Sequence, residues 1–316
     1  EICACLVGSE MCIRDRYRMV EQGQQEYAQI PVISLNLMGE EKHTGFRITP
    51  SLLSGGIAAG CYGDLIMCLY QQVKPYEQNP GETDRIRSQV EKKLCESIRR
   101  HRNGRHTREK NYRYACEVFS KVPVKPGKKK RVGITGEIYM KYSKLGNDDI
   151  ESFLLRQGME PYSGGFVNYC LYLVDTERYK AEKYQHNPIM AKACAFVLHR
   201  LCEAQKHLLT VIGETDRFQT DLPFPELKEK VQGILAEGCN TGDGWLIAAE
   251  VIQYVEKGCG SVLILHPFGC LVSHVCERGI LQRLHARFPD VSIQTIEYDY
   301  DQSKTLRESR ILLAIS

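Results

Sequence analysis

The chain has 316 residues, a length that favours two domains. Its composition, 43% hydrophobic and 26% charged residues, is ordinary for a soluble globular protein, and its net charge of +3 is too small to indicate a nucleic acid or a membrane as a partner. The 14 cysteines form no dense, regular framework and nothing resembles a signal peptide, so we expect mainly reduced thiols and a cytoplasmic location.

The first residues, 1–16 (EICACLVGSEMCIRDR), resemble a translated sequencing adapter rather than a folded segment. They show no hydrophobic periodicity and do not join the pattern that follows. We therefore expect a segment that packs against nothing, exclude its cysteines as ligands, and expect the natural N-terminal part to be missing. The alternative is a genuine short tail.

The next region, residues 17–127, is expected to be the end of a partial α/β domain followed by helices. Residues 30–36 (IPVISLN) are apolar and β-branched, as is typical of a strand. Residues 50–74 are expected to be helical, and Pro75 ends this block because proline cannot continue helical hydrogen bonding.

A charged helical segment is expected after the sequence NPGETDR, residues 79–85, and should continue to about Ser120. The acidic residues place its N-terminal cap near Glu82 or Thr83. The basic run at residues 99–108 (RRHRNGRHTR) could contact RNA, but a solvated helix end or loop fits the near-neutral charge balance better.

Residues 51–73 have about the length and apolarity of a membrane span. Asp64 lies in the middle, where a charge would be costly in lipid, and several glycines interrupt the run. The small-residue spacing of Gly56 and Gly60 suits close helix packing. We expect a buried helix or helix pair in a soluble core, and no membrane.

The Pro/Gly/Lys-rich stretch 122–131 (VPVKPGKKKR) is typical of a linker and marks the expected boundary of a second domain, residues 128–316. Beyond it, apolar strand-like runs alternate with amphipathic helical segments. This alternation predicts an α/β fold with a parallel, flavodoxin/Rossmann-like sheet. The expected strands are residues 131–138, the short run at 159–164, 261–270 and 291–299.

In such a sheet the carboxyl ends of the strands and the N-termini of the following helices share one edge, where ligands bind. Cys259 precedes its strand and is expected at the opposite edge, whereas Cys239 could share the edge of Cys270. The segments expected at the ligand-binding edge are residues 136–139, 240–245, 267–270 and 297–299.

Cys270, in the stretch LHPFGCLVSH, stands where a strand turns into a helix. Exposed N–H groups at a helix N-terminus favour a thiolate there, and thiolates bind iron–sulfur clusters. Gly269 would let the backbone approach a bulky group. The alternative is a small apolar residue in a tight turn. The sequence has no CxxC pair, and Cys276 is too loosely spaced from Cys270 for a common ligand motif.

Two further segments offer polar groups at this edge. The glycines of NTGDGW, residues 240–245, could expose N–H groups to a phosphate, or simply form a cap and a packing turn. Glu137 could donate a proton or cap a neighbouring helix. We take Glu137, Gly242, Asp243 and Gly269 as candidate cofactor-binding residues and Cys270 as the candidate metal ligand.

Several motifs together resemble one family. IPVISLN, GDLIMCLYQQVKPYE, RVGITGEIYMKY with LGN, NTGDGW, HPFGCL and IEYD occur in the order found in the proteins related to 2-hydroxyacyl-CoA dehydratase activases. The resemblance covers about residues 17–316. Two motifs depart from the family pattern: PFGCLVSH keeps His274 but lacks the Pro and Asn of PFGCLPNH, and EYDYDQS replaces DYDPGAS.

The resemblance implies a [4Fe–4S] protein in ATP-coupled, low-potential electron transfer of anaerobic acyl-CoA metabolism. It implies three cysteine ligands, of which Cys270 would be one and two would lie upstream. This chain would then be a C-terminal fragment without the ATPase domain, and its partner would be an electron-transfer protein or an acyl-CoA enzyme.

Two other hypotheses remain open from the residues themselves. The chain could be a non-catalytic regulatory or assembly module with a Rossmann-like fold. Alternatively, Cys270 could act as a nucleophile, which needs a general base such as the flanking His266 or His274 within reach of its sulfur. A lone histidine is more often a structural residue.

Overall fold

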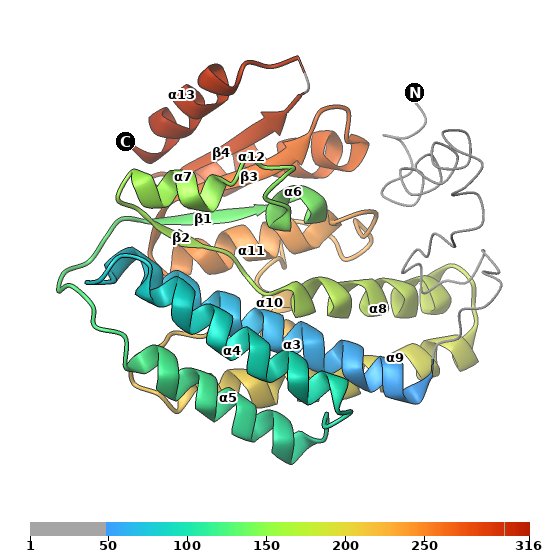
Figure 1. The fold of residues 1–316 in the computed structure, drawn as a ribbon. Coiled ribbons are helices and arrows are strands. Elements are labelled where there is room, and N and C mark those ends of the chain that lie inside the picture. The colour runs from blue at the N-terminus through green and yellow to red at the C-terminus, as the bar shows by residue number, and fades with distance from the viewer. Residues whose placement is uncertain (1–48, 300) are drawn as a thin grey trace, which may run out of the picture.

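The computed structural model describes residues 49–299 and 301–316, so the segment 1–16 and the strand expected at 30–36 lie outside the described residues. The fold is α/β, as predicted, and is consistent with a Rossmann- or flavodoxin-like architecture (Figure 1). Its four-stranded sheet is parallel throughout, in the order β2-β1-β3-β4. The strands are β1 Arg131–Gly136, β2 Glu160–Tyr162, β3 Cys259–Pro267 and β4 Ser292–Tyr298.

One face of the sheet is covered by three helices: α6 Ile138–Tyr142, α7 Ile150–Arg156 and α13 Lys304–Ile315. Alternate residues of a strand point to opposite faces, and Leu263 and Leu265 of β3 point to this one. They are fully buried against apolar side chains of α7 and α13, such as Leu154 and Ile311. This gives the sheet a compact apolar core on its first face.

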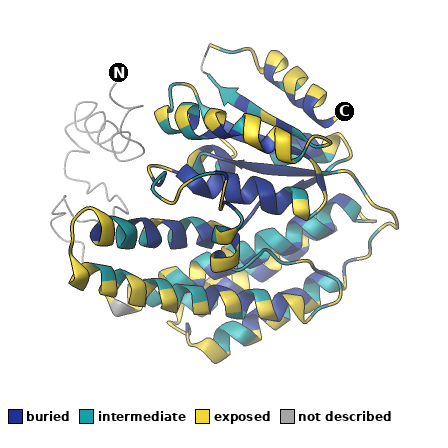
Figure 2. Cartoon of the chain, turned by 180° about the vertical axis from the view of Figure 1, so that it is seen from behind, coloured by how far each residue is buried: buried dark blue, intermediate teal, exposed yellow. Residues whose placement is uncertain are grey.

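The other face packs on α11 Gly244–Glu256 and α12 Arg278–Arg287, which a π-helical turn, η2 Ser273–Glu277, precedes. Helix α11 is buried along almost its whole length and is the dark blue helix near the centre of Figure 2. Val262 and Ile264 of β3 point to this face. The strands are therefore apolar on both faces, as buried parallel strands usually are.

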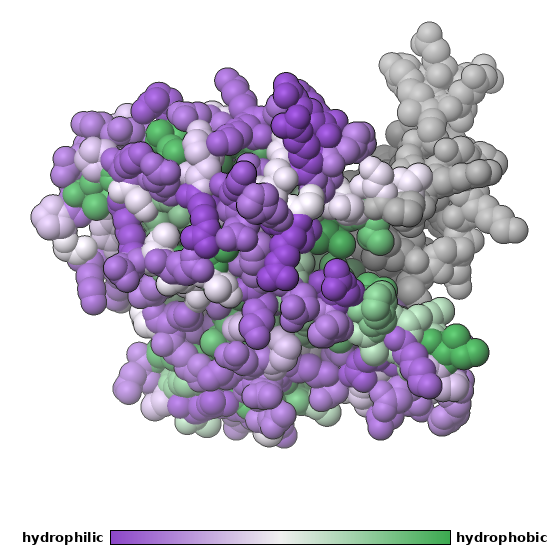
Figure 3. Space-filling view, turned by 90° about the horizontal axis from the view of Figure 1, so that it is seen from below, coloured by the Kyte–Doolittle hydropathy of each residue, from purple (hydrophilic) through white to green (hydrophobic). Residues whose placement is uncertain are grey.

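A second layer of helices packs against α11 on the side away from the sheet (Figure 1). Seen from below, the exposed face of this layer is mostly hydrophilic, with apolar side chains in small groups (Figure 3). The helices are α3 Pro50–Val73, α4 Glu82–Arg99, α5 Arg105–Ser120, α8 Phe166–Lys183, α9 Pro188–Gly213 and α10 Phe224–Glu229, with the 3-10 turn η1 Lys74–Tyr76 after α3.

The charged segment expected as one helix is in fact two, α4 and α5. The chain turns between them at His101, whose φ of 51° is left-handed, and Gly104 caps α5. The start of α4 agrees with the expectation: Gly81, with a φ of 86°, is the cap, and the acidic Glu82 and Asp84 lie in the first turn. Glycine fits this position because it adopts positive φ without strain.

The apolar block after residue 49 forms the single helix α3. Within the described residues, one helical segment, Ser51–Tyr76, is long and apolar enough to cross a membrane. Its side chains Leu65, Leu69 and Val73 are fully buried in the core that α3 shares with its neighbouring helices. These buried side chains account for part of the apolar composition of α3, while Leu52 and Leu53 near its start are exposed.

Asp64 in the middle of α3 accepts hydrogen bonds from the backbone N–H groups of Phe166, at 2.7 Å, and Val167, at 3.0 Å. These are the first residues of α8, so the carboxylate caps a second helix. Burial raises the pKa of Asp64 to about 7. The charge that interrupts the apolar run thus fixes one core helix to another.

The linker at 122–131 does not separate two cores. Phe119 before it and Val122 at its start belong to the same buried cluster as Trp245 and Ile264 beyond it. Tyr76 also reaches across and donates to Glu160 of β2 at 2.7 Å. The helical layer and the sheet therefore share apolar surface, whichever boundary is drawn between them.

Candidate functional site

The carboxyl ends of β1, β3 and β4 meet at one edge of the sheet, as predicted. The N–H of Phe268 donates to Tyr298 O at 2.8 Å and links the exits of β3 and β4. Glu137 N–H donates to Leu265 O at 2.8 Å and links the exits of β1 and β3. Helix α11 begins at the same edge, where the backbone N–H of Ile138 bonds to the Asp243 carboxyl.

Three acidic side chains gather at this edge: Glu137, Asp243 and Glu277. Burial is the main cause of their raised pKa values. The charge of Glu137 raises the pKa values of Asp243 and Glu277 further. The pKa of Glu137 is raised by burial alone. The pKa of Glu277 rises to about 8. Glu137 also caps α6, because its carboxylate accepts from Met140 N–H at 3.0 Å.

Glu277 was not anticipated from the sequence. It is 1% exposed, and neither carboxylate oxygen has a hydrogen-bond partner among the described residues. The nearby Ser273 hydroxyl lowers its pKa but donates instead to the sulfur of Cys270, at 3.2 Å. No spacing rule marks Glu277, because it reaches the edge only through the π-helical turn η2.

Cys270 occupies the turn after β3, half-buried and close to these acids. Its N–H donates to Pro267 O at 3.3 Å, which closes the turn, and Gly269 has a φ of 75° that favours glycine. Burial raises the pKa of the Cys270 thiol, and the charges of Glu277 and Glu137 raise it further, against the hydrogen bond from Ser273. Burial and the nearby acids therefore outweigh the lowering of the Cys270 pKa that we expected from a helix N-terminus.

Two more cysteines, Cys239 and Cys276, lie in this region. The sequence spacing between Cys270 and Cys276 does not match a common ligand motif. Cys276 lies one helical turn beyond the Cys270 turn, and its pKa is raised by burial and then by the charges of Cys239, Glu277 and Cys270. Cys239 precedes α11 and so joins Cys270 at the edge. Cys259 begins β3 at the opposite end of the strand, as expected.

The NTGDGW segment forms a cap and a packing turn. Gly244 has a φ of 32°, and a Cβ there would lie 2.1 Å from Cys239 O. Gly242 lies less close to its neighbour, since a Cβ there would meet the Val272 side chain at 3.0 Å. The first N–H groups of α11 are already used, since Trp245 donates to Cys239 O at 2.9 Å. With Asp243 and Glu137 beside it, this segment offers little to a phosphate.

A buried ion pair lies beneath the edge. Lys141 Nζ donates to both carboxylate oxygens of Glu250, at 2.7 and 2.8 Å, and Thr135 donates to the same carboxylate at 2.6 Å. All three side chains are buried. The pair joins α6, α11 and β1, so it fixes the elements that carry Glu137 and Asp243.

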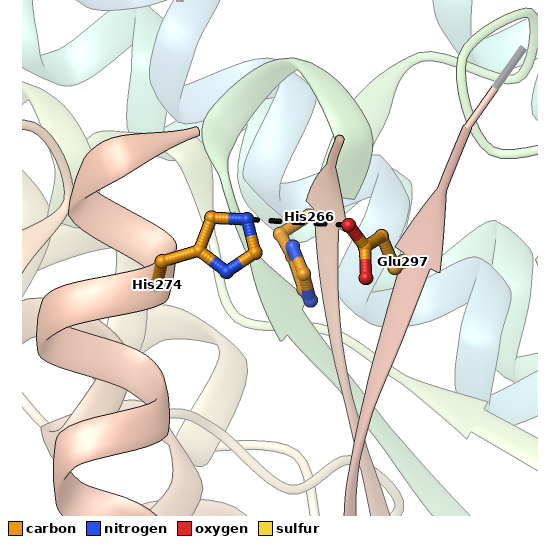
Figure 4. A group of neighbouring side chains, drawn as sticks. All are labelled: His266, His274 and Glu297. Atoms are coloured by element: carbon orange, nitrogen blue, oxygen red, sulfur yellow. Dashed lines mark ion pairs between the residues drawn. The ribbon is translucent and has the colours of Figure 1, made fainter. Parts of the chain in front are cut away.

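His274 is joined to Cys270 through the backbone, because its N–H donates to Cys270 O at 3.0 Å, but the rings of His274 and His266 contact other groups. His274 Nε2 is 4.0 Å from Glu297 Oε1, and the two histidine rings meet edge to face with centroids 5.5 Å apart (Figure 4). Burial lowers the pKa of His266, and Glu297 acts in the opposite direction. Neither ring bonds to the Cys270 sulfur among the described residues, so the nucleophile–base hypothesis lacks its base.

Comparisons of the chain with protein-family models, with curated proteins and with solved structures found no match.

Proposed function

We propose that this chain is the cluster-binding region of an iron–sulfur protein resembling the 2-hydroxyacyl-CoA dehydratases, with Cys270 as one iron ligand. The observation that carries the proposal is the position of Cys270. It follows β3, an interior strand between β1 and β4, at the ligand-binding edge of a parallel sheet. The ordered motifs that include HPFGCL agree with this position.

The residues present fit a thiolate ligand at Cys270. The side chain is half-buried, so a group outside the turn can reach it. Ser273 donates a hydrogen bond to its sulfur, and such bonds tune the reduction potential of a cluster. The neighbouring Glu277, with a pKa of about 8, carries a proton at neutral pH. The acids around Cys270 therefore add less negative charge than their number implies.

The cluster, when bound, would supply one-electron transfer at low potential. Cys270 would hold it, and Gly269 would let the turn approach it. The Cys276 thiol interacts electrostatically with both Cys239 and Cys270, while the resemblance implies two further ligands upstream. The partner would be an electron-transfer protein or an acyl-CoA enzyme. Every described cysteine is a free thiol, which fits the reducing cytoplasm proposed for this protein.

The experiment is anaerobic production of the full-length gene product, as the natural protein and with Cys270→Ala. We expect the natural protein to carry iron and acid-labile sulfide and the variant to lose most of both. Cys95→Ala is the matched control, because Cys95 is an exposed thiol on α4 far in sequence from the edge. Equal iron in all three proteins would contradict the proposal.

A further inference from the structure

His266 is a buried histidine whose ring nitrogens make no well-formed hydrogen bond. It is 0% exposed, near the end of β3, and among the described residues its ring meets the His274 ring and the backbone of Pro267, which raises its pKa against the effect of burial. Buried polar groups are nearly always paired, and one left without a partner calls for an explanation. A neutral imidazole with an unused lone pair is the commonest metal ligand in proteins.

The sheet register places a carboxylate beside this ring. His266 of β3 pairs directly with Glu297 of β4, and both point to the same face of the sheet as Ile264 and Ile293, the face that packs on α11 and α12. His274 approaches from the same side on the π-helical turn η2 (Figure 4). Such turns are frequent at functional sites because they redirect a side chain within a helix.

The three side chains can converge on one ion. One ligand atom from each lies within 4.8 Å of the other two. Zinc binds histidine nitrogen and carboxylate oxygen at about 2.0–2.2 Å in tetrahedral geometry, so two ligand atoms of one ion lie about 3.4 Å apart. The 4.0 Å between His274 Nε2 and Glu297 Oε1 is slightly longer than this separation, and it is too long for a hydrogen bond.

The second oxygen of Glu297 is held from the other side. Arg278 Nη2 donates to Glu297 Oε2 at 3.0 Å, which leaves Oε1 directed toward the histidines. Hydrogen bonds that orient a ligating carboxylate are typical around metal sites. His274 and Glu297 are 31% and 21% exposed, so an ion can enter from solvent, while small rotations of these side chains close the remaining separation.

We propose that His266, His274 and Glu297 form a binding site for a divalent transition-metal ion of the zinc class. Two imidazoles and one carboxylate are the protein ligands of many zinc sites that keep an open position. Nitrogen donors select such ions over magnesium and calcium, which prefer oxygen. The site shares no ligand with the cluster proposed at Cys270, so each can be tested without the other.

Cobalt(II) is the probe, because its visible absorption reports the donor atoms around it. The metal-free 316-residue chain is titrated with Co²⁺ as the natural sequence, as His274→Ala and as Glu297→Gln. We expect the natural chain to develop bands of nitrogen and oxygen ligation, and each variant to bind Co²⁺ at least about 10-fold more weakly. His199→Ala is the control, since His199 is an exposed histidine of α9, and it should match the natural chain.

Near-ultraviolet circular dichroism without metal checks that each variant is folded. If His274→Ala alone loses its signal, Glu297→Gln decides the test, because the amide keeps the shape of the carboxylate. Unchanged Co²⁺ affinity in a folded variant would overturn the proposal. So would a natural chain that binds no Co²⁺, or one whose only bands are sulfur-to-cobalt charge transfer that disappears in Cys270→Ala.

Discussion

At the scale of single residues, buried polar groups without partners distinguish the sheet edge from the rest of the core. Glu277 and His266 are each almost fully buried, and their polar side-chain atoms make no well-formed hydrogen bond among the described residues. A buried polar group left unpaired costs about 1–3 kcal/mol. Such groups are found where a proton, an ion or a ligand supplies the missing partner. Both residues lie where the ends of β3 and β4 meet the following helix.

The protonation of Glu277 makes stability depend on pH. Its pKa is about 8 in the folded chain against 4.5 for the free side chain, so the folded state holds the proton between these values while the unfolded state releases it. Stability therefore falls as pH rises through this window. Each pKa unit corresponds to about 1.4 kcal/mol, so the loss amounts to a few kcal/mol.

Glu277→Gln removes this contribution, and its unfolding free energy should fall less between about pH 5 and pH 8 than that of the natural chain. Urea unfolding at both pH values measures the difference. The groups that face Glu277 include Glu137, Asp243, Ser273 and Arg278, and the raised pKa values of Glu137 and Asp243 keep a slope of the same sign in the variant. Identical slopes in the two proteins would show that Glu277 does not carry this proton.

Gly244 at the start of α11 tests the packing turn. Gly244→Ala places a Cβ 2.1 Å from Cys239 O in a backbone with positive φ, so we expect a loss of about 2–4 kcal/mol from clash and strain together. Gly258→Ala has a φ of 86° but meets nothing within 4 Å, so it reports strain alone, about 1 kcal/mol. Equal losses in chemical denaturation would contradict the close approach.

At the scale of elements, the order of strands and helices beyond residue 128 follows from the sequence, because apolar runs alternate with amphipathic segments. The shared edge of the strand ends follows from the parallel arrangement. The site does not follow: His266 meets Glu297 only through the register of β3 on β4, and Lys141 meets Glu250 across 109 residues. We expected one helical segment to about Ser120, and the signal for the break between α4 and α5 lies in the run 99–108, where Asn103–Gly104 is a common turn pair.

Helix α3 offers a test of its place in the core. Leu65 is fully buried, so Leu65→Ala should lower the unfolding free energy by about 2–5 kcal/mol. Leu53, on the same helix, is 53% exposed, and Leu53→Ala should change it by less than about 1 kcal/mol. A loss at Leu53 as large as that at Leu65 would mean that a partner or a membrane covers the exposed side of α3.

At the scale of the whole molecule, one apolar core links the helical layer to the sheet, and a second core lies on the far face. The helical layer positions α11, α11 positions Asp243, and β3 positions His266 near its end and Cys270 in the turn that follows. The edge is thus held by buried structure on both faces of the sheet. A rigid support of this kind suits a site whose ligands must keep a fixed geometry.

The central claim is that Cys270 ligates an iron–sulfur cluster. The most direct test is the low-temperature electron paramagnetic resonance spectrum of the full-length protein, prepared anaerobically and reduced with dithionite. We predict a cluster signal in the natural protein and in Cys95→Ala, and its loss or a change of its shape in Cys270→Ala. The same signal, with the same iron content, in Cys270→Ala would contradict the account.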